Sequence, residues 1–383
     1  KLQFGSLLPV PAPYPPPPLC RETTGSFLCL SFRRPSRVSP SRHSPVHFLL
    51  LLLFKKKKKK IFMTMTGTLV VTATSLVSPT LFLAGFITVF PILYIANAYC
   101  RYKRYQAASP WSVNDKVVVI TGASSGIGEE LAYEFARQGA RLILCARRAD
   151  KLSDVAKVCK EKYGASHVTI SKVDVTHETD VNRLIETIDA THDKIDCLVL
   201  NAGVSMGEAL EDIKDFKVIK DIMDVNFYGS TMFAYHALPL LKRAEKSRIV
   251  VVSSLISIIP SVPLRSGYSA SKSALKGFFE SLQAELIDSN IFISTAFPGI
   301  VKTEINDARL GSNPKNLDFS NAMPADECAK IIVDGTIKAH KEIILTSVGK
   351  FSRLLEGVFP DLLSYVSHRE AKKYIVESKD KDQ

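Results

Sequence analysis

The sequence predicts an α/β protein with a single domain, built as a doubly wound parallel sheet and preceded by an N-terminal transmembrane helix. From Val113 onward, short runs rich in Val and Ile alternate with helix-length segments. These runs show little polar alternation, as expected for strands covered by helices on both faces. A third observation predicts the membrane helix: the forty residues from Ile61 to Cys100 contain no charged side chain, and about 20 apolar residues suffice to span a bilayer.

Six short apolar segments are predicted as strands: Lys116–Thr121, Arg141–Ala146, His167–Val173, Cys197–Leu200, Arg248–Ser253 and Ile291–Phe297. Helices are predicted between them, including Gly126–Gln138, Val225–Lys242 and Tyr268–Ser289. Strands and helices that alternate at this spacing form a parallel sheet with helices on both faces. Because no internal repeat interrupts the pattern, we expect one domain over 113–345, followed by a C-terminal extension over 346–383.

The positive charge of the chain is concentrated in its first third. Residues 1–112 contain fifteen Lys or Arg and a single acid, Glu22, whereas residues 113–383 contain 35 basic and 37 acidic residues. The net charge of +12 therefore does not belong to the predicted domain, and nucleic acid is not expected as a partner. The seven cysteines form no C-x-x-C pair, so neither a disulfide framework nor a metal site is expected.

Residues 1–62 are expected to be disordered and not to belong to the natural mature protein. Ten of the twenty prolines lie in residues 1–45, six lysines follow at 55–60, and the first methionine is Met63. A stretch rich in Pro, Ser and Arg buries too little apolar surface to offset its ordering entropy. The alternative is a polybasic tether at a membrane surface.

Residues 67–100 are predicted to form a single membrane-spanning anchor. Leu81–Tyr99 is the most apolar part, and it is followed by Arg101, Lys103 and Arg104. The positive-inside rule then places the following domain in the cytosol, although translation of the six lysines at 55–60 would reverse this orientation. Two alternatives are a cleaved signal peptide and a hairpin broken at Pro79 and Pro91.

A glycine-rich turn follows the first predicted strand, with the sequence TGASSGIG from Thr121 to Gly128. Gly122 permits a tight turn, and Gly126 and Gly128 let the backbone approach a pyrophosphate at a helix N-terminus. Because the turn lies between a predicted strand and a predicted helix, it indicates a dinucleotide-binding site rather than a merely flexible connection.

The second predicted strand ends at Ala146 and is followed by Arg147 and Arg148, with no acid. An NAD site places an acid here to bind the ribose 2′-hydroxyl, whereas an arginine pairs with a 2′-phosphate. The sequence therefore predicts NADP(H) as cofactor, bound through Arg147. The alternative is that Arg147 is a solvated loop charge.

Together with later motifs, the glycine turn resembles the short-chain dehydrogenase/reductase superfamily in order and spacing. The later motifs are Asp174 in VDVT, Asn201-Ala202-Gly203, Asn226, Ser254, Tyr268-x-x-x-Lys272 and Pro298-Gly299-x-Val301-x-Thr303. With the predicted anchor, the chain is similar to the membrane-bound branch that includes 11β-hydroxysteroid dehydrogenase type 1 and dehydrogenase/reductase family member 7. The resemblance implies a Rossmann-type fold and a location in the endoplasmic reticulum membrane, with the catalytic domain cytosolic by the charge argument above.

The resemblance also implies the residues of the site. Catalysis is assigned to Ser254, Tyr268, Lys272 and Asn226. Cofactor binding is assigned to Gly122, Ser124, Ser125, Gly126, Ile127, Gly128, Arg147, Asp174, Asn201, Ala202, Gly203, Tyr268, Lys272, Pro298, Gly299, Val301 and Thr303.

The assignment of Tyr268 as acid and base has a chemical reason. A phenol with a pKa near 10 is a poor proton donor or base at neutral pH, and a nearby ammonium favours the phenolate. Tyr268 and Lys272 lie one helical turn apart on one face, whereas Tyr99 and Lys103, which also fit Y-x-x-x-K, straddle the end of the apolar segment. Ser254 lies fourteen residues before Tyr268 where the family has thirteen, so the loop between them is expected to hold one extra residue.

The expected function is an NADP(H)-dependent oxidoreductase that interconverts a hydrophobic ketone or aldehyde and its alcohol. The resemblance suggests a steroid, a retinoid or another lipid-like substrate, and an apolar loop after Ser254 is consistent with a lipophilic pocket. Its apolar residues are Leu255, Ile256, Ile258, Ile259, Val262 and Leu264. The expected partners are this substrate, membrane lipid and, as one option, a second copy of the chain. The alternative function is a catalytically silent membrane-surface scaffold that retains nucleotide binding.

Overall fold

A seven-stranded sheet forms the centre of the protein. The computed structural model describes residues 88–89, 91–100, 103, 111–259, 262–306, 309–311 and 322–380. The strands are β1 (Val117–Thr121), β2 (Arg141–Ala146), β3 (Val168–Lys172), β4 (Cys197–Leu200), β5 (Ser247–Val252), β6 (Ile291–Phe297) and β7 (Glu342–Ile344). Their order is β3-β2-β1-β4-β5-β6-β7, and each neighbouring pair is parallel. The predicted doubly wound parallel sheet is therefore confirmed.

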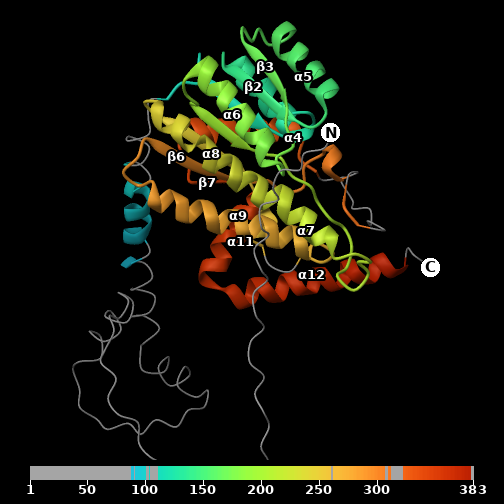
Figure 1. Ribbon diagram of the computed structural model, residues 1–383. Coiled ribbons are helices and arrows are strands. Elements are labelled where there is room, and N and C mark those ends of the chain that lie inside the picture. The colour runs from blue at the N-terminus through green and yellow to red at the C-terminus, as the bar shows by residue number, and fades with distance from the viewer. Residues whose placement is uncertain are drawn as a thin grey trace, which may run out of the picture. The chain divides into compact units, whose positions relative to one another are not determined.

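Helices cover both faces of this sheet (Figure 1). On one face lie α4 (Gly126–Arg137), α5 (Ala149–Glu161) and α10 (Ala325–Ile337), and on the other lie α6 (Glu178–His192), α8 (Gly229–Arg243) and α9 (Ser266–Glu285). Successive strand residues point to opposite faces. In β1, Val118 and Ile120 join the first core, whereas Val117 and Val119 join the second. Both cores need apolar residues, which explains why the first four residues of β1 are the unbroken apolar run VVVI.

The remaining helices are short or follow the sheet. They are α7 (Lys217–Met223), the π-helical turn η1 (Asp224–Tyr228), the 3-10 turns η2 (Leu255–Ser257) and η3 (Glu304–Asn306), α11 (Ser347–Val358) and α12 (Pro360–Asp380). The predicted helix Val225–Lys242 thus begins as a π-helical turn before α8, and such turns occur frequently at functional sites.

Two strands differ from the sequence-based expectation. The prediction that every strand is covered on both faces is wrong for β3, in which three of five residues are exposed, because β3 lies at the edge of the sheet. The other edge strand, β7, was not predicted. Its three residues are too few to show a recognisable period.

The predicted membrane anchor over 67–100 requires a correction. Most of this range, like residues 1–62, lies outside the described residues, and within it the structure describes helical residues at 88–89 and 91–100. Among the described residues, no helix has the length and apolar character needed to cross a membrane. This finding contradicts the predicted single-pass anchor and the location in the endoplasmic reticulum membrane inferred from it.

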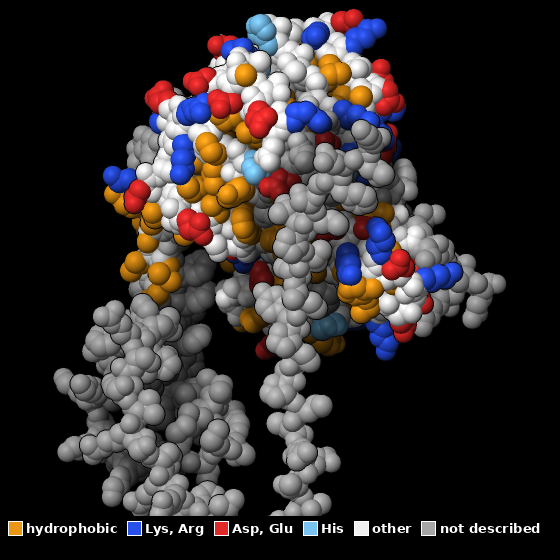
Figure 2. Space-filling model, viewed as in Figure 1, with side chains coloured by type: hydrophobic (Ala, Val, Ile, Leu, Met, Phe, Trp, Pro, Cys, Tyr) orange, Lys and Arg blue, Asp and Glu red, His pale blue; other side chains and the backbone are white. Residues whose placement is uncertain are grey.

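Hydrophobic side chains gather over α8 on the face shown in Figure 2. Tyr228 and Tyr235 are exposed, and they border a hollow of about 720 Å³ between α6, η1, α8 and α9. Glu178, His236 and Phe278 also line this hollow. None of the predicted site residues lines it, so the candidate active site lies elsewhere.

Candidate active site

The glycine turn lies where the sheet order reverses, between β1 and β4. Open α/β sheets bind ligands at the carboxyl ends of strands at such a switch point. Gly122 and Gly126 have φ angles of +65° and +59°, a region that glycine adopts without strain. Asn201 Nδ2 at the end of β4 donates to Thr121 O (3.1 Å) and Gly122 O (3.2 Å) at the end of β1. The two strand ends are therefore fastened to each other beneath the turn.

A cavity of about 300 Å³ opens at this edge of the sheet. Eleven of the predicted cofactor residues line it: Gly122, Ser124, Ser125, Gly126, Ile127, Arg147, Asp174, Asn201, Ala202, Gly203 and Thr303. Other lining residues were missed by the sequence analysis, including Arg148, Glu304 and Ile305. The cavity thus brings together the loops after five strands, β1, β2, β3, β4 and β6, which are far apart in the chain.

The residues of the turn fit a dinucleotide phosphate. A Cβ atom at Gly128 would lie 2.2 Å from Gly122 O and 2.5 Å from Asn201 Nδ2, so only glycine permits this close approach. Helix α4 begins at Gly126, and the backbone N–H groups of a first helical turn have no partner within the helix. These groups and the helix dipole favour an anion. Gly128 itself lies beneath the turn and does not line the cavity.

Arg147 and Arg148 lie differently. Arg147, with a side chain that is 67% exposed, lies 3.9 Å from an Asp174 carboxylate oxygen. Arg148 instead crosses the rim of the cavity, where Nη2 donates to Ser124 Oγ (3.1 Å) and Ser125 Oγ (2.7 Å) and Nε donates to Ser124 Oγ (3.3 Å). Of these two arginines, only Arg147 was predicted to bind the cofactor, although Arg148 has the same chemistry.

Asp174 is ionised at this edge. Burial raises the pKa of its carboxyl, but hydrogen bonds from the Thr176 backbone and hydroxyl and the charge of Arg147 outweigh this effect, and the pKa lies below its ordinary value. The carboxylate remains available to polar groups of a ligand because Asp174 lines the cavity.

The predicted catalytic side chains converge beside this cavity. Tyr268 and Lys272 are buried, and Lys272 Nζ lies 5.8 Å from the centroid of the Tyr268 ring. The pKa of Tyr268 lies above its ordinary value, because burial outweighs the lowering by the Arg265 guanidinium and by a hydrogen bond with the Ser254 side chain. Ser254 and Tyr268 are therefore in contact despite the extra residue in the loop between them. Leu264 in that loop has a φ of +62°.

Asn226 joins the loop after β4 to helix α9. Val204 N donates to its Oδ1 (2.8 Å), and its Nδ2 donates to Val204 O (3.0 Å) and to Ser271 Oγ (2.9 Å). Ser271 in turn donates to Tyr268 O (2.8 Å). The π-helical turn η1 thus positions an amide that connects a cavity-lining loop to the turn of α9 between Tyr268 and Lys272.

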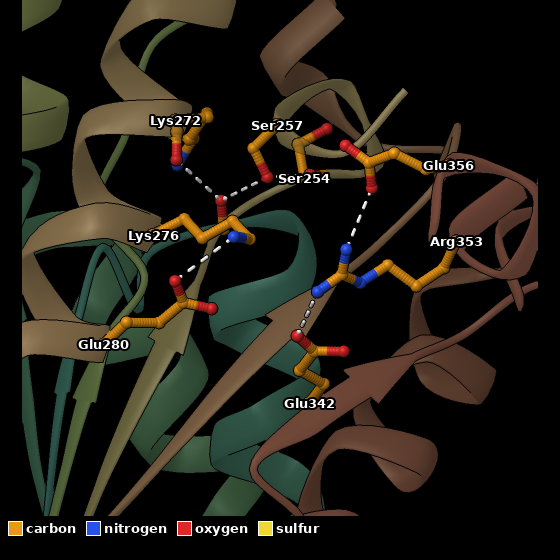
Figure 3. Close-up of polar contacts among 9 residues, drawn as sticks. Ser254, Ser257, Lys272, Lys276, Glu280, Glu342, Arg353 and Glu356 are labelled. Atoms are coloured by element: carbon orange, nitrogen blue, oxygen red, sulfur yellow. Dashed lines mark hydrogen bonds and ion pairs between the residues drawn. The ribbon is translucent and has the colours of Figure 1, made fainter. Parts of the chain in front are cut away.

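Two further serines hold the end of β5 against α9. Ser253 Oγ donates to Lys272 O (3.1 Å) and lies 3.2 Å from Ser257 Oγ, which donates to Ser254 O (2.7 Å). Figure 3 shows Ser254 and Ser257 beside Lys272 in this network. Lys272 Nζ also donates to Val252 O at the end of β5 (2.9 Å). Hydrogen bonds therefore fix the backbone of Ser254 relative to Lys272.

Apolar residues surround Tyr268. It packs in a small cluster with Met206, Ile222 and Ile256, of which only Ile256 belongs to the predicted apolar loop. Leu255, from the same loop, contacts the start of α11, where a Cβ at Gly349 would lie 2.5 Å from it. Arg353 ties α11 to β7 through an ion pair with Glu342 (3.2 Å), and it forms a second ion pair with Glu356 (2.9 Å) within α11, as Figure 3 shows.

The other predicted residues lie outside the cavity. Pro298 O accepts from Leu255 N (2.8 Å), Gly299 lies against Leu255 and Thr346, and buried Val301 bridges Met323. These residues shape the loop after Ser254 rather than the cavity wall. The second Y-x-x-x-K pair lies apart from these contacts, because Tyr99 is 58% exposed and its neighbour is Lys103, at 5.8 Å from the ring centroid.

Lys272 predicts a pH dependence of stability. Burial lowers the pKa of its ammonium from 10.5 to about 8, so between these values the unfolded chain binds the additional proton. The contribution of this group to the free energy of unfolding is lowest below about pH 8 and rises as the pH rises above it, by up to about 1.4 kcal/mol per pH unit.

Urea unfolding of wild type and Lys272→Met between about pH 8 and 9 measures this contribution. The variant lacks the titrating group, so its curve is expected to rise less steeply. Other titrating groups, such as the buried Cys145 and Cys197 thiols, are common to both proteins and cancel in the comparison. Parallel curves would show that the Lys272 ammonium is not destabilised by burial.

Comparisons with known proteins agree with this geometry. The sequence profile of the family described as short chain dehydrogenase matches residues 116–312. A protein of Arabidopsis thaliana named 11-beta-hydroxysteroid dehydrogenase-like 2 is 39% identical over 255 residues, which cover 67% of this chain and 81% of that protein.

Solved structures share the fold. A short chain dehydrogenase/reductase from Burkholderia phymatum, in complex with NAD, superposes with a TM-score of 0.60 at 23% identity, covering 66% of this chain and 96% of that one. An alcohol dehydrogenase from Thermococcus sibiricus, complexed with 5-hydroxy-NADP, has a TM-score of 0.55 at 27% identity, covering 62% and 98%.

Proposed function

Because the chain belongs to the short-chain dehydrogenase family, we propose that it is an NADP(H)-dependent oxidoreductase that interconverts a hydrophobic ketone or aldehyde and its alcohol. One observation carries the proposal: Ser254, Tyr268 and Lys272 meet beside a cavity that has a glycine turn and a helix N-terminus in its wall. The nicotinamide dinucleotides in the two solved structures named above support the same cofactor class.

The side chains have distinct roles in this proposal. A bound nicotinamide cofactor would supply or accept the hydride. In the reduction direction, Tyr268 donates its phenolic proton to the oxygen that develops negative charge, and Ser254 holds that oxygen by a hydrogen bond. The Lys272 ammonium stabilises the phenolate that remains. Asn226 acts through its bonds to Val204 and Ser271, which hold the two sides of the site together.

The substrate class follows from the surroundings of Tyr268. Met206, Ile222 and Ile256 pack around it, which favours a substrate with apolar surface next to its carbonyl group. The name of the Arabidopsis relative supports a steroid or another lipid-like molecule. The proximity of Ser254 to Tyr268 favours an enzyme over a silent scaffold, because the extra loop residue was the feature that suggested a scaffold.

The test is oxidation of NADPH by the purified protein with a panel of hydrophobic ketones and aldehydes, including steroids and retinal. Turnover of at least one lipid-like carbonyl compound is expected, with small polar carbonyl compounds as the comparison. Retained NADPH binding without turnover of any compound would instead favour the scaffold.

The cofactor preference gives a second prediction. NADPH is expected to bind more tightly than NADH because Arg147 and Arg148 both line the cavity and a guanidinium pairs with a 2′-phosphate. Arg147→Asp is expected to abolish or reverse the preference. Arg148→Met is expected to weaken NADPH binding by about 1.5–3 kcal/mol, roughly 10- to 150-fold. Titration of nucleotide fluorescence measures both constants, and equal wild-type affinities for NADPH and NADH would disprove the preference.

A further inference from the structure

Arg148 contacts an acid as well as the two serines. Its Nη1 lies 3.2 Å from Glu304 Oε2, and this ion pair joins the loop after β2 to η3, which follows β6. Both residues line the cavity, and their side chains are 48% and 58% exposed. The pair therefore lies at the rim of the candidate cofactor site, within reach of a ligand from solvent.

The contacts of Arg148 leave little room for another anion. Nε and Nη2 donate to the Ser124 and Ser125 hydroxyls, and Nη1 donates to Glu304. A guanidinium binds a phosphate best through two N–H groups on one edge. Bidentate binding of a phosphate at Arg148 therefore requires at least one present partner to leave. The two serines carry no charge, whereas the Glu304 carboxylate and a phosphate dianion repel each other. Glu304 is therefore the partner that is expected to leave.

We propose that Glu304 is a specificity-determining residue, which occupies on Arg148 the position that the 2′-phosphate of NADP(H) takes. The inference rests on the proposed function and adds to it a residue that competes with the 2′-phosphate for Arg148. Glu304 lowers the affinity for NADP(H) and leaves the affinity for NAD(H) unchanged, because only the phosphorylated cofactor needs the Arg148 guanidinium. The preference for NADP(H) is consequently smaller than the two arginines alone would produce.

The size of the effect follows from the exposure of the ion pair. Exposed pairs contribute little to stability, and a phosphate with a charge near −2 is a stronger partner for arginine than a carboxylate. The phosphate therefore displaces Glu304, and removing the carboxylate is expected to tighten NADPH binding about two- to fivefold.

Binding of NADPH and NADH to wild type and Glu304→Gln, measured by fluorescence titration, tests the proposal without any substrate. The variant is expected to bind NADPH more tightly and NADH as the wild type does. Asp150→Asn is the matched control, because Asp150 is an acid of the α5 first turn two residues from Arg148 and does not line the cavity. This control is expected to leave both dissociation constants unchanged.

A double-mutant cycle with Arg148→Met tests whether Glu304 acts on NADPH binding through Arg148. In that background, Glu304→Gln is expected to have no effect on NADPH binding, because the competition has no target. If wild type prefers NADPH, two results overturn the inference but not the proposed function. The first is unchanged or weaker NADPH binding by Glu304→Gln, and the second is an equal gain in the affinity for NADH. A wild-type protein that binds neither nucleotide overturns the proposed function and the inference together.

Discussion

Replacement of Tyr268 by Phe is expected to reduce turnover by about 10³-fold, within the range that general acid–base groups contribute. The change removes one hydroxyl and keeps the ring, which packs with Met206, Ile222 and Ile256. Neither the fold nor the cavity should change, because Tyr268 does not line the cavity. The dissociation constant of NADPH is therefore expected to stay the same while the rate of NADPH oxidation with a lipid-like ketone falls.

Tyr99→Phe provides the matched control, since Tyr99 belongs to the second Y-x-x-x-K pair. Its exposed side chain has no part in the network of Ser254, Asn226 and Lys272, and wild-type turnover is expected. If both variants lost activity equally, or if neither did, the active site would have been placed wrongly.

Replacement of Gly128 by Ala is expected to have the largest effect on the cofactor site. The added methyl group would lie 2.2 Å from Gly122 O, a backbone atom, and 2.5 Å from Asn201 Nδ2. Neither atom can move without opening the bonds that fasten β1 to β4. Overpacking of this kind costs about 1–3 kcal/mol, occasionally more. We expect a lower free energy of unfolding in urea and loss of measurable NADPH binding.

Gly277→Ala is the matched control, because it makes the same substitution at a glycine far from the cofactor turn. Gly277 lies inside α9, and a Cβ there would meet nothing within 4 Å. Alanine in a helix interior is more favourable than glycine by about 0.5–1 kcal/mol, so this variant is expected to be slightly more stable and to bind NADPH normally. Normal NADPH binding by Gly128→Ala would show that the turn tolerates a side chain, contrary to the close approach described above.

Six of the seven strands and most residues of the site could be predicted from the amino-acid pattern alone. The VVVI run of β1 and the CLVL run of β4 are apolar because both faces of the sheet are covered, and this pattern is visible without coordinates. The glycine turn could be predicted because positive φ angles strain every residue other than glycine, so a turn of this shape leaves glycines in the sequence. Tyr268 and Lys272 could be paired because a helix brings residues four apart onto one face.

The neighbours of these residues, in contrast, depend on how the chain folds in three dimensions. Nothing local distinguishes Arg147 from Arg148, because adjacent loop residues point in directions that the packing of the loop determines. Glu304 lies 156 positions from Arg148, and no spacing rule connects two loops at that separation. The same reason applies to the bonds of Asn226 with Val204 and Ser271 and to the contact between Leu255 and α11. The carboxyl ends of parallel strands bring these segments to one edge of the sheet, so their contacts exist only once the sheet has formed.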